Sequence, residues 1–346
     1  MKLSNIKHLQ KSLITVCLII VFFPFLPGVG RSRPLADKGF LDKNGNWTYF
    51  KYITSLNNDL ADKLAALQVE ELALDGVTGI TASQAETLAG FTGVHISLNG
   101  LRKVEDAQIK ALSRFKGSQL SLDGLKDLSV AQAVALGKFK GNILSLNGIS
   151  TIEDEQLEAI SAFQGKSLQL NGLTELGECR FHASPCSVNS GTPGKSKHSE
   201  SHRSLRITGP AGMLARFKGN ELGLNGLKNI CVSQAVAFSR FKGKSISLNG
   251  LTYLHPDETL FLTMFSGEYL ALNGLTSISD IRQVKAFANF TGNALSLEGI
   301  TTITDKHLRI LARFKGDWIY FKKLDRKLQA RYKKYRQSYL NSIDSD

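Results

Sequence analysis

The sequence predicts an α/β solenoid in which each coil supplies one short parallel strand and one helix. Three observations support this prediction: a segment L-x-L-N-G-L recurs along the 346 residues, most of its steps are 24 residues long, and each copy precedes a helix-type pattern. A unit this short cannot bury its own apolar side chains, so it must stack on similar neighbours. The first leucine-like residue of each copy is Leu72, Ile96, Leu120, Leu144, Leu168, Leu222, Ile246, Leu270 and Leu295, with a partial copy at Ile319.

The strand comes first in each coil. In one coil Leu144 and Leu146 flank Ser145, and alternation of apolar and small polar residues is typical of a strand with one buried face. Two residues later a glycine follows in all nine full coils, from Gly76 to Gly299. We expect the backbone either to turn there through a conformation closed to other residues or to pass close to the next coil.

The helix follows the strand. Thr81 and Gln84 have the spacing of a capping box, which predicts that a helix begins at this point. A glycine near the end of the coil, such as Gly93, is expected to end the helix in a left-handed turn. Three apolar residues, three positions apart, form an inward stripe between these signals; in this coil they are Ala85, Leu88 and Phe91.

One coil comes closest to a known consensus: it carries Leu295, Leu297, Ile300, Ile303, Thr304, Asp305, Leu308 and Leu311. It resembles the leucine-rich repeat of the bacterial type, whose phrase is L-x-L-x-x-[TC]-x-I-T-D, and the likeness spans roughly residues 72–322. Two features depart from that family: an apolar residue replaces its usual Asn, Thr or Cys, and F-[KT]-G replaces a leucine near the helix end. The resemblance implies a right-handed solenoid with strands on a concave face and a non-enzymatic role in binding a partner.

The repeats also divide the chain. The solenoid is predicted to cover residues 72–324, and residues 31–47 are predicted to form a linker before it. Residues 48–71 fit a degenerate coil that caps the N-terminal end of the stack. Its apolar positions are Phe50, Ile53, Leu56, Leu64 and Leu67.

Residues 1–30 have the pattern of a secretory signal peptide. Lys2, Lys7 and Lys11 precede an apolar run over residues 13–23, which is too short to span a membrane. We therefore expect an exported protein, located outside the cell, in the periplasm or on the cell surface. The alternative is an uncleaved membrane anchor over residues 12–30.

An insert of about 30 residues, near 178–208, interrupts one coil. It is rich in Ser, Gly, Pro, His and Arg, as a flexible loop would be. Its Cys179, Cys186, His198 and His202 follow the order C-x6-C-x11-H-x3-H, which is wider than the usual zinc spacing. A flexible loop, a metal site and an error in the gene model all remain open.

Basic residues account for the formal charge of +13. They flank the inward phenylalanine of several coils and should form a discontinuous ridge along the helix ends: Arg114, Lys116, Lys138, Lys140, Arg216, Lys218, Arg240, Lys242, Arg313 and Lys315. Residues 325–346 are predicted to form a basic helix or tail, either a solvated cap or a polyanion site. The candidate polyanion-binding residues are Lys322, Lys323, Arg326, Lys327, Arg331, Lys333, Lys334 and Arg336.

The sequence offers no catalytic constellation, no cofactor motif and no metal cluster within the repeats. A row of Asn and Asp, from Asp75 to Asn273, either binds a ligand or forms a ladder between coils. The residue before each leading leucine varies most, so His95, Tyr269 and Trp318 are candidate partner contacts. We expect an exported, non-enzymatic protein that binds a protein or cell-envelope partner; the alternative is a binder of nucleic acid, anionic lipid or acidic glycan.

Overall fold

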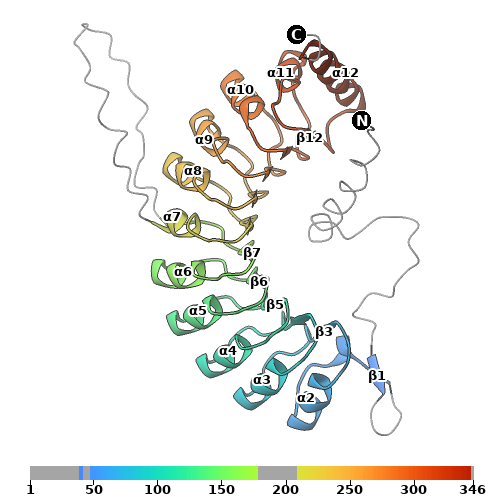
Figure 1. The fold of residues 1–346 in the computed structure, drawn as a ribbon, viewed down its shortest axis with the longest axis vertical. Helices are drawn as coiled ribbons and strands as arrows, with labels where there is room; N and C mark the ends of the chain where they lie inside the picture. The colour runs from blue at the N-terminus through green and yellow to red at the C-terminus, as the bar shows by residue number, and fades with distance from the viewer. Residues whose placement is uncertain (1–38, 42–46, 178–208, 344–346) are drawn as a thin grey trace, which may run out of the picture.

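The computed structural model of the chain describes residues 39–41, 47–177 and 209–343. The predicted export segment and the insert, with its cysteines and histidines, lie outside the described residues. The rest is a curved stack of strand-helix coils, with the strands on the inner side of the curve and the helices on the outer side (Figure 1).

One ten-stranded sheet runs through the stack in chain order, and every neighbouring pair of its strands is parallel. The predicted α/β solenoid is therefore confirmed. Its strands are β3 (Glu71–Ala73), β4 (His95–Ser97), β5 (Gln119–Ser121), β6 (Ile143–Ser145), β7 (Ser167–Gln169), β8 (Glu221–Gly223), β9 (Ser245–Ser247), β10 (Tyr269–Ala271), β11 (Ala294–Ser296) and β12 (Trp318–Tyr320).

The strands pair in the register that the repeat predicts. Each leading leucine-like residue faces its counterpart in the next coil, and the partial copy follows the rule because Leu295 pairs with Ile319. Leu168 pairs with Leu222 in the same way across the long step in the repeat. The insert therefore leaves the sheet continuous from β7 to β8.

The helices begin where the capping boxes predict. At the first of these, Thr81 Oγ1 accepts the N–H of Gln84 at 3.2 Å, and Gln84 Oε1 accepts the N–H of Thr81 at 2.8 Å. Gln84 Nε2 also donates to the carbonyl oxygen of Leu56 in the preceding coil at 3.0 Å, so one side chain both starts a helix and joins two coils. The helices are α2 (Asn58–Ala65), α3 (Ala82–Ala89), α4 (Asp106–Leu112), α5 (Val130–Gly137), α6 (Asp154–Ser161), α7 (Pro210–Leu214), α8 (Val232–Ser239), α9 (Pro256–Leu262), α10 (Ile281–Asn289), α11 (Asp305–Leu311) and α12 (Arg326–Ile343).

Phenylalanine rings stack along the core, one from each coil. Neighbouring ring centroids lie 6.0 to 6.5 Å apart, and the rings are at most 24° from parallel. The leading leucines and the helix stripe are buried beside them, which explains why the coils share one continuous interior. The stacked rings are Phe91, Phe115, Phe139, Phe163, Phe217, Phe241, Phe265, Phe290 and Phe314.

The expected left-handed turn at the helix-end glycines is wrong. Within the described ranges the glycines with positive φ are Gly177 and Gly209, not the glycines of the repeat. A Cβ at Gly141 would overlap the ring of Phe139, and the same holds in the other coils. These glycines make room for the stacked rings.

The strand-end glycines confirm the second alternative, in which the backbone passes close to a neighbouring coil. A Cβ at Gly148 would overlap the carbonyl oxygens of Asp123 and Leu125 in the preceding coil. Close approach of the two backbones therefore excludes any side chain at this position.

Each end of the described stack carries an extra element. At the N-terminal end, η2 (Phe50–Tyr52) and α2 bury Phe50 and Leu64, while β1 (Gly39–Leu41) and β2 (Trp47–Tyr49) form an antiparallel pair that the sequence did not predict. At the C-terminal end, α12 packs beside α11. The ring of Tyr332 meets Phe321 edge-on at 5.2 Å between centroids.

Candidate functional site

The concave face displays two rows of side chains: the residues immediately before the leading leucines and the residues immediately after them. The row before the leucines holds His95 on β4, Tyr269 on β10 and Trp318 on β12. Ala294 stands between Tyr269 and Trp318 in this row, whereas β5 to β9 separate His95 from Tyr269. The structure thus brings Tyr269 and Trp318 to one end of the face and leaves His95 near the other.

The row of Asn and Asp forms a ladder between coils. Asn147 Oδ1 accepts the N–H of Asn171 at 3.0 Å, and the Asn147 N–H donates to Asp123 Oδ1 at 2.8 Å. Asn147 Nδ2 also donates to Ser145 Oγ at 2.8 Å, and the Ser145 hydroxyl donates to Asp123 Oδ1 at 2.6 Å. Because these polar atoms are engaged within the stack, the row serves structure rather than ligand binding.

His95 joins three strands at the N-terminal end of the concave face. Its Nδ1 lies 3.2 Å from Glu71 Oε1, and its Nε2 lies 2.9 Å from Ser121 Oγ. One tautomer satisfies both contacts, with Nδ1–H donating to Glu71 and Nε2 accepting the Ser121 hydroxyl. This order of acid, base and hydroxyl is the order of a nucleophilic triad.

The surroundings of Ser121 do not complete such a site. Its side chain is buried, and Gln119 Nε2 donates to its hydroxyl oxygen at 3.2 Å. The following N–H of Leu122 donates to the Ser145 carbonyl at 2.9 Å, so it is not free to bind an oxyanion. We interpret Glu71, His95 and Ser121 as a polar link between coils.

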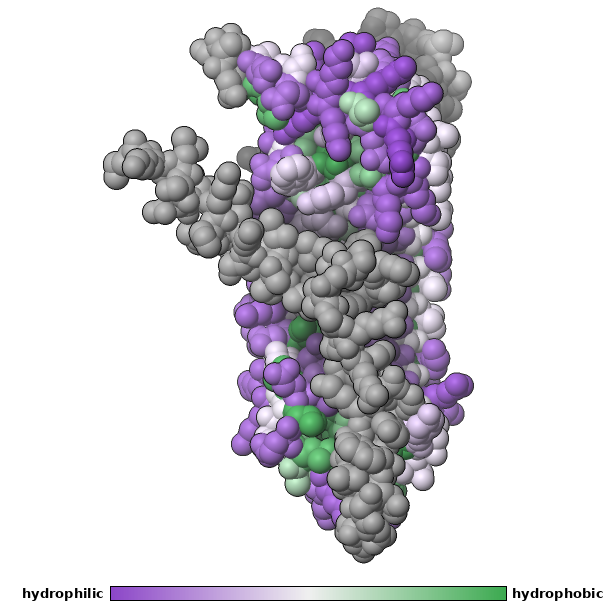
Figure 2. Space-filling view, turned by 90° about the vertical axis from the view of Figure 1, so that its right-hand side faces the viewer, coloured by the Kyte–Doolittle hydropathy of each residue, from purple (hydrophilic) through white to green (hydrophobic). Residues whose placement is uncertain are grey.

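The C-terminal end of the concave face carries exposed aromatic side chains. Trp318 is 63% exposed and Tyr320 is 43% exposed, whereas their neighbours on β11, Ala294 and Ser296, are small and buried. β12 is also the last strand, and within the described residues no strand pairs with its outer edge. Figure 2, which faces the concave side, shows hydrophilic residues gathered at the upper end, where these coils lie.

Helix α12 is fixed to the stack by polar contacts as well as by apolar packing. Arg336 donates through its guanidinium to the carbonyl oxygens of Ala312, Phe314 and Gly316, which follow α11. Arg336 is therefore engaged in closing the stack. This contact could not be read from the sequence, because nothing distinguishes Arg336 from the other basic residues of the segment.

Tyr332 on α12 and Asp305 at the start of α11 have shifted pKa values. Burial raises the pKa of Tyr332 to about 12. The Tyr335 hydroxyl donates to Asp305 at the start of α11, and this hydrogen bond, followed by Arg309, lowers the pKa of the Asp305 carboxyl. The contacts hold α12 against α11 and leave its opposite face exposed.

The basic residues outside these contacts face solvent. The guanidinium of Arg331 lies 3.5 Å from Asp305 Oδ1 but remains largely exposed. The ridge residues that flank the buried phenylalanines are exposed as predicted. The other exposed basic side chains at this end are Lys322, Lys323, Arg326, Lys327, Lys333 and Lys334.

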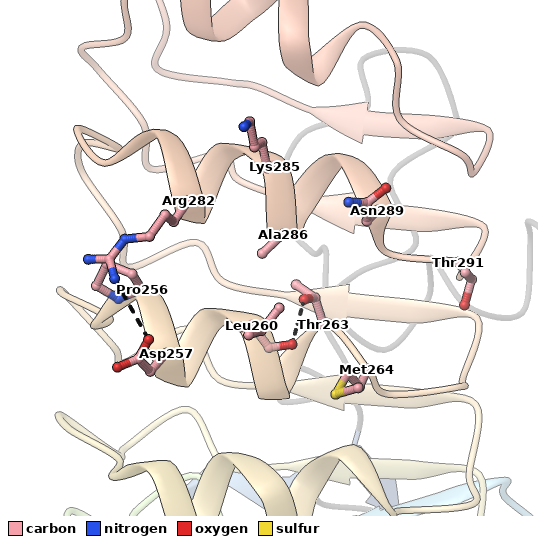
Figure 3. Close-up of a pocket in the computed structure, with 10 residues that line it drawn as sticks. All are labelled: Pro256, Asp257, Leu260, Thr263, Met264, Arg282, Lys285, Ala286, Asn289 and Thr291. Carbon is pink, nitrogen blue, oxygen red and sulfur yellow. Dashed lines mark hydrogen bonds and ion pairs between the residues drawn. The ribbon is translucent and has the colours of Figure 1, made fainter. Parts of the chain in front are cut away.

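Sequence reasoning missed a hollow of about 520 Å³ between α9 and α10 on the outer side of the stack (Figure 3). Leu260 on α9 and Met264 just after that helix line it and are 51% and 64% exposed. Lys285 and Ala286 line it from α10. The available signal was a departure from the repeat: Met264 stands where the preceding coil carries Arg240 and the last full coil carries Arg313.

The described residues contain no group of three or more His, Cys, Asp or Glu side chains arranged to hold a metal ion. In the same part of the chain, no helix has the length and apolarity needed to cross a bilayer. The predicted export segment and the cysteines and histidines of the insert lie outside it.

No family model matches the sequence, and no curated protein matches it. Among solved structures, the chain is similar to an internalin of Listeria monocytogenes, with a TM-score of 0.38 and 11% identity over 83% of this chain and 81% of that one. It is also similar to a chain in the Toll–Spatzle complex of Drosophila, with a TM-score of 0.40 and 11% identity over 73% of this chain and 36% of that one. A leucine-rich-repeat protein of Leptospira interrogans gives a TM-score of 0.26 and 15% identity over 87% of this chain and 94% of that one.

Proposed function

We propose that this chain is a non-enzymatic, exported interaction protein that holds a protein or cell-envelope partner against the C-terminal end of its concave face. The observation that carries the proposal is the exposed pair Trp318 and Tyr320 on β12. Large aromatic side chains are the residues that most often anchor interfaces, and here they stand beside the small side chains of β11. Curved solenoids commonly bind partners on such extended surfaces.

The outer edge of β12, with which no strand of the described ranges pairs, supports the same location. An edge strand offers unpaired N–H and C=O groups to another extended segment, and exposed aromatic residues on both sides of Ile319 would give that segment side-chain contacts. Tyr269 completes the candidate contacts two strands away. The partner would thus meet backbone and aromatic groups at one place.

Export and family type belong to this proposal and rest on sequence patterns. The basic and apolar pattern of residues 1–30 favours a cleaved signal, with an anchor over residues 12–30 as the alternative. The coil from Leu295 to Leu311 favours a divergent leucine-rich repeat of the bacterial type.

The test is purification of the full chain from its own cells after chemical crosslinking, followed by mass spectrometry. We expect a partner that still crosslinks when the reagent is added in about 0.3 M salt, because apolar contacts are not screened. The double variant Trp318→Ala/Tyr320→Ala should lose it, while Tyr253→Ala, which removes an aromatic side chain that is 63% exposed elsewhere, should keep it. An equal yield from the double variant would reject the concave-face site, and a mature N-terminus at Met1 would reject the cleaved signal.

A second candidate function is polyanion binding by α12 and the residues before it. Its basis is a set of exposed basic side chains: Arg326, Lys327, Lys333 and Lys334 on α12, which Arg336 fixes to the stack, and Lys323 just before that helix. Binding of heparin, duplex DNA or phosphatidylglycerol vesicles should then weaken at least tenfold between about 50 and 200 mM salt. Lys333→Glu/Lys334→Glu should weaken it further, whereas Lys110→Glu on α4 should have little effect; salt-independent binding would exclude this function.

A further inference from the structure

The basic ridge on the outer side of the stack has a gap at two neighbouring coils. Arg240 and Lys242 flank Phe241, and Arg313 and Lys315 flank Phe314, but Met264 and Ser266 flank Phe265 in the coil between them. The next coil also lacks the basic pair, since Asn289 and Thr291 flank Phe290. The gap therefore lies between two intact parts of the ridge.

The hollow between α9 and α10 occupies this gap (Figure 3). Leu260 on α9 and Met264 in the turn just after it are four residues apart, and they expose apolar surface where α3 and α6 carry a glutamate at the position of Leu260. Ala286 and Thr263 are buried and form its floor. The result is an apolar strip that lies between two basic parts of the ridge.

The rim of the hollow is cationic. Arg282 is held by Asp280 at 3.0 Å and lies 3.9 Å from Asp257, so its charge is largely compensated. Lys285 is exposed, and within the described residues no acidic side chain pairs with it. An acidic group on a partner that covers the apolar strip would therefore find an unpaired cation in Lys285.

We propose that the hollow between α9 and α10 binds the apolar face of an acidic amphipathic helix from a partner protein. Two apolar side chains one turn apart on that helix would pack on Leu260 and Met264, as in other helix-in-groove complexes. Its acidic residues would face Lys285 and the ridge cations on both sides. This site is on the outer side of the stack, so it is independent of the proposal for β12.

The test uses a fluorescein-labelled synthetic peptide of about 18 residues, made of Glu, Ala and Leu with leucines at a helical spacing of three and four. Its binding to the full chain is measured by fluorescence anisotropy. One control peptide has Gln in place of each Leu, and a second has Lys in place of each Glu. We expect saturable binding of the first peptide and at least tenfold weaker binding of both controls.

Met264→Arg is the decisive variant, because Arg216, Arg240 and Arg313 occupy this position in other coils and the variant should fold normally. It adds a positive charge, so simple electrostatic attraction would strengthen binding of the acidic peptide, whereas the proposal expects at least tenfold weaker binding. Lys285→Glu should also weaken binding. Ala162→Arg places an arginine at the corresponding position of a different coil, away from the hollow, and should not weaken it. Circular dichroism confirms that each variant is folded.

Three results would overturn the proposal. They are no binding to the wild-type chain, equal binding of the Gln control peptide, and unchanged or stronger binding to Met264→Arg. The second and third would show that the peptide only adheres to a basic surface.

Discussion

The coils from β4 to α6 and the coils from β9 to α10 share one core but differ in two respects. Phe139 in the first region and Phe265 in the second are both buried and stacked on their neighbours. The first region has Gln as the third residue of each helix, whereas α9 has Glu258. The first region also exposes the shorter Val130 and Val134 on α5, whereas the second exposes the longer Leu260 and Met264 beside the hollow.

This difference separates what the fold requires from what it tolerates. The leucine, phenylalanine and glycine rows recur in both regions because each coil is the packing surface of the next. Outward positions of the helices contact solvent, so their departures leave the stack intact. Exposed departures in a repeat protein are therefore the place to look for function, and buried departures are the place to look for instability.

Loss of a stacked ring should have the largest effect and should be the same in both regions. We expect Phe139→Ala and Phe265→Ala each to lower the free energy of unfolding by about 3–5 kcal/mol, because each leaves a cavity in the shared core. Urea denaturation followed by circular dichroism measures this. Val134→Ala, at an exposed position of α5, should change it by less than about 0.5 kcal/mol. A much smaller loss for Phe265→Ala would mean that the two regions do not share one core.

A change in the Asn ladder should have the second largest effect on the free energy of unfolding. Asn147→Ala removes the acceptor of the Asn171 N–H and the donor to Ser145 Oγ, so it should cost about 1–3 kcal/mol through unsatisfied polar groups. The same denaturation experiment measures the cost, and Asn142→Ala, whose amide makes an exposed contact with Ser118, is the control. Equal costs for the two variants would contradict a structural role for the row.

The sequence predicted the parts of the fold that repeat. The L-x-L-N-G-L motif and its spacing together located every leading leucine, including Ile319, because the sheet register follows the repeat. It also placed the capping boxes, since Thr81 and Gln84 act within one short segment. The reason for Gly141 was missed because it depends on the position of the Phe139 ring rather than on local conformation.

The candidate sites were less accessible to prediction from sequence. Trp318 and Tyr269 were placed in one row correctly, but exposure of Tyr320 follows from β12 being the last strand. The link between His95, Glu71 and Ser121 joins three coils through side-chain geometry that spacing does not specify. The hollow beside Met264 required knowing how α9 and α10 pack.

Glu258→Gln should have the smallest effect on the free energy of unfolding and, unlike the two changes above, should raise it. In the regular coils Gln132 Nε2 donates to the Val104 carbonyl at 2.8 Å, but an ionised Glu258 has no proton to donate to the equivalent carbonyl of Ile230. Restoring Gln should raise the free energy of unfolding at pH 7 by about 1 kcal/mol, the net contribution of one hydrogen bond. The converse change, Gln132→Glu, should lower it by about 1–3 kcal/mol.

The pH dependence of this gain gives an independent check. Burial raises the pKa of Glu258 in the folded chain, partly offset by the N–H of His255 and the charge on its ring. The folded state therefore binds this proton more tightly than the unfolded chain, and the wild type loses stability as pH rises from 4.5 through the raised pKa. The two proteins differ only at position 258, so the comparison isolates the effect of this carboxyl. The advantage of Glu258→Gln, measured by urea denaturation across this range, should be full at pH 7 and should shrink as pH falls toward 4.5; an advantage that does not change with pH would show that the carboxyl is ionised in both states.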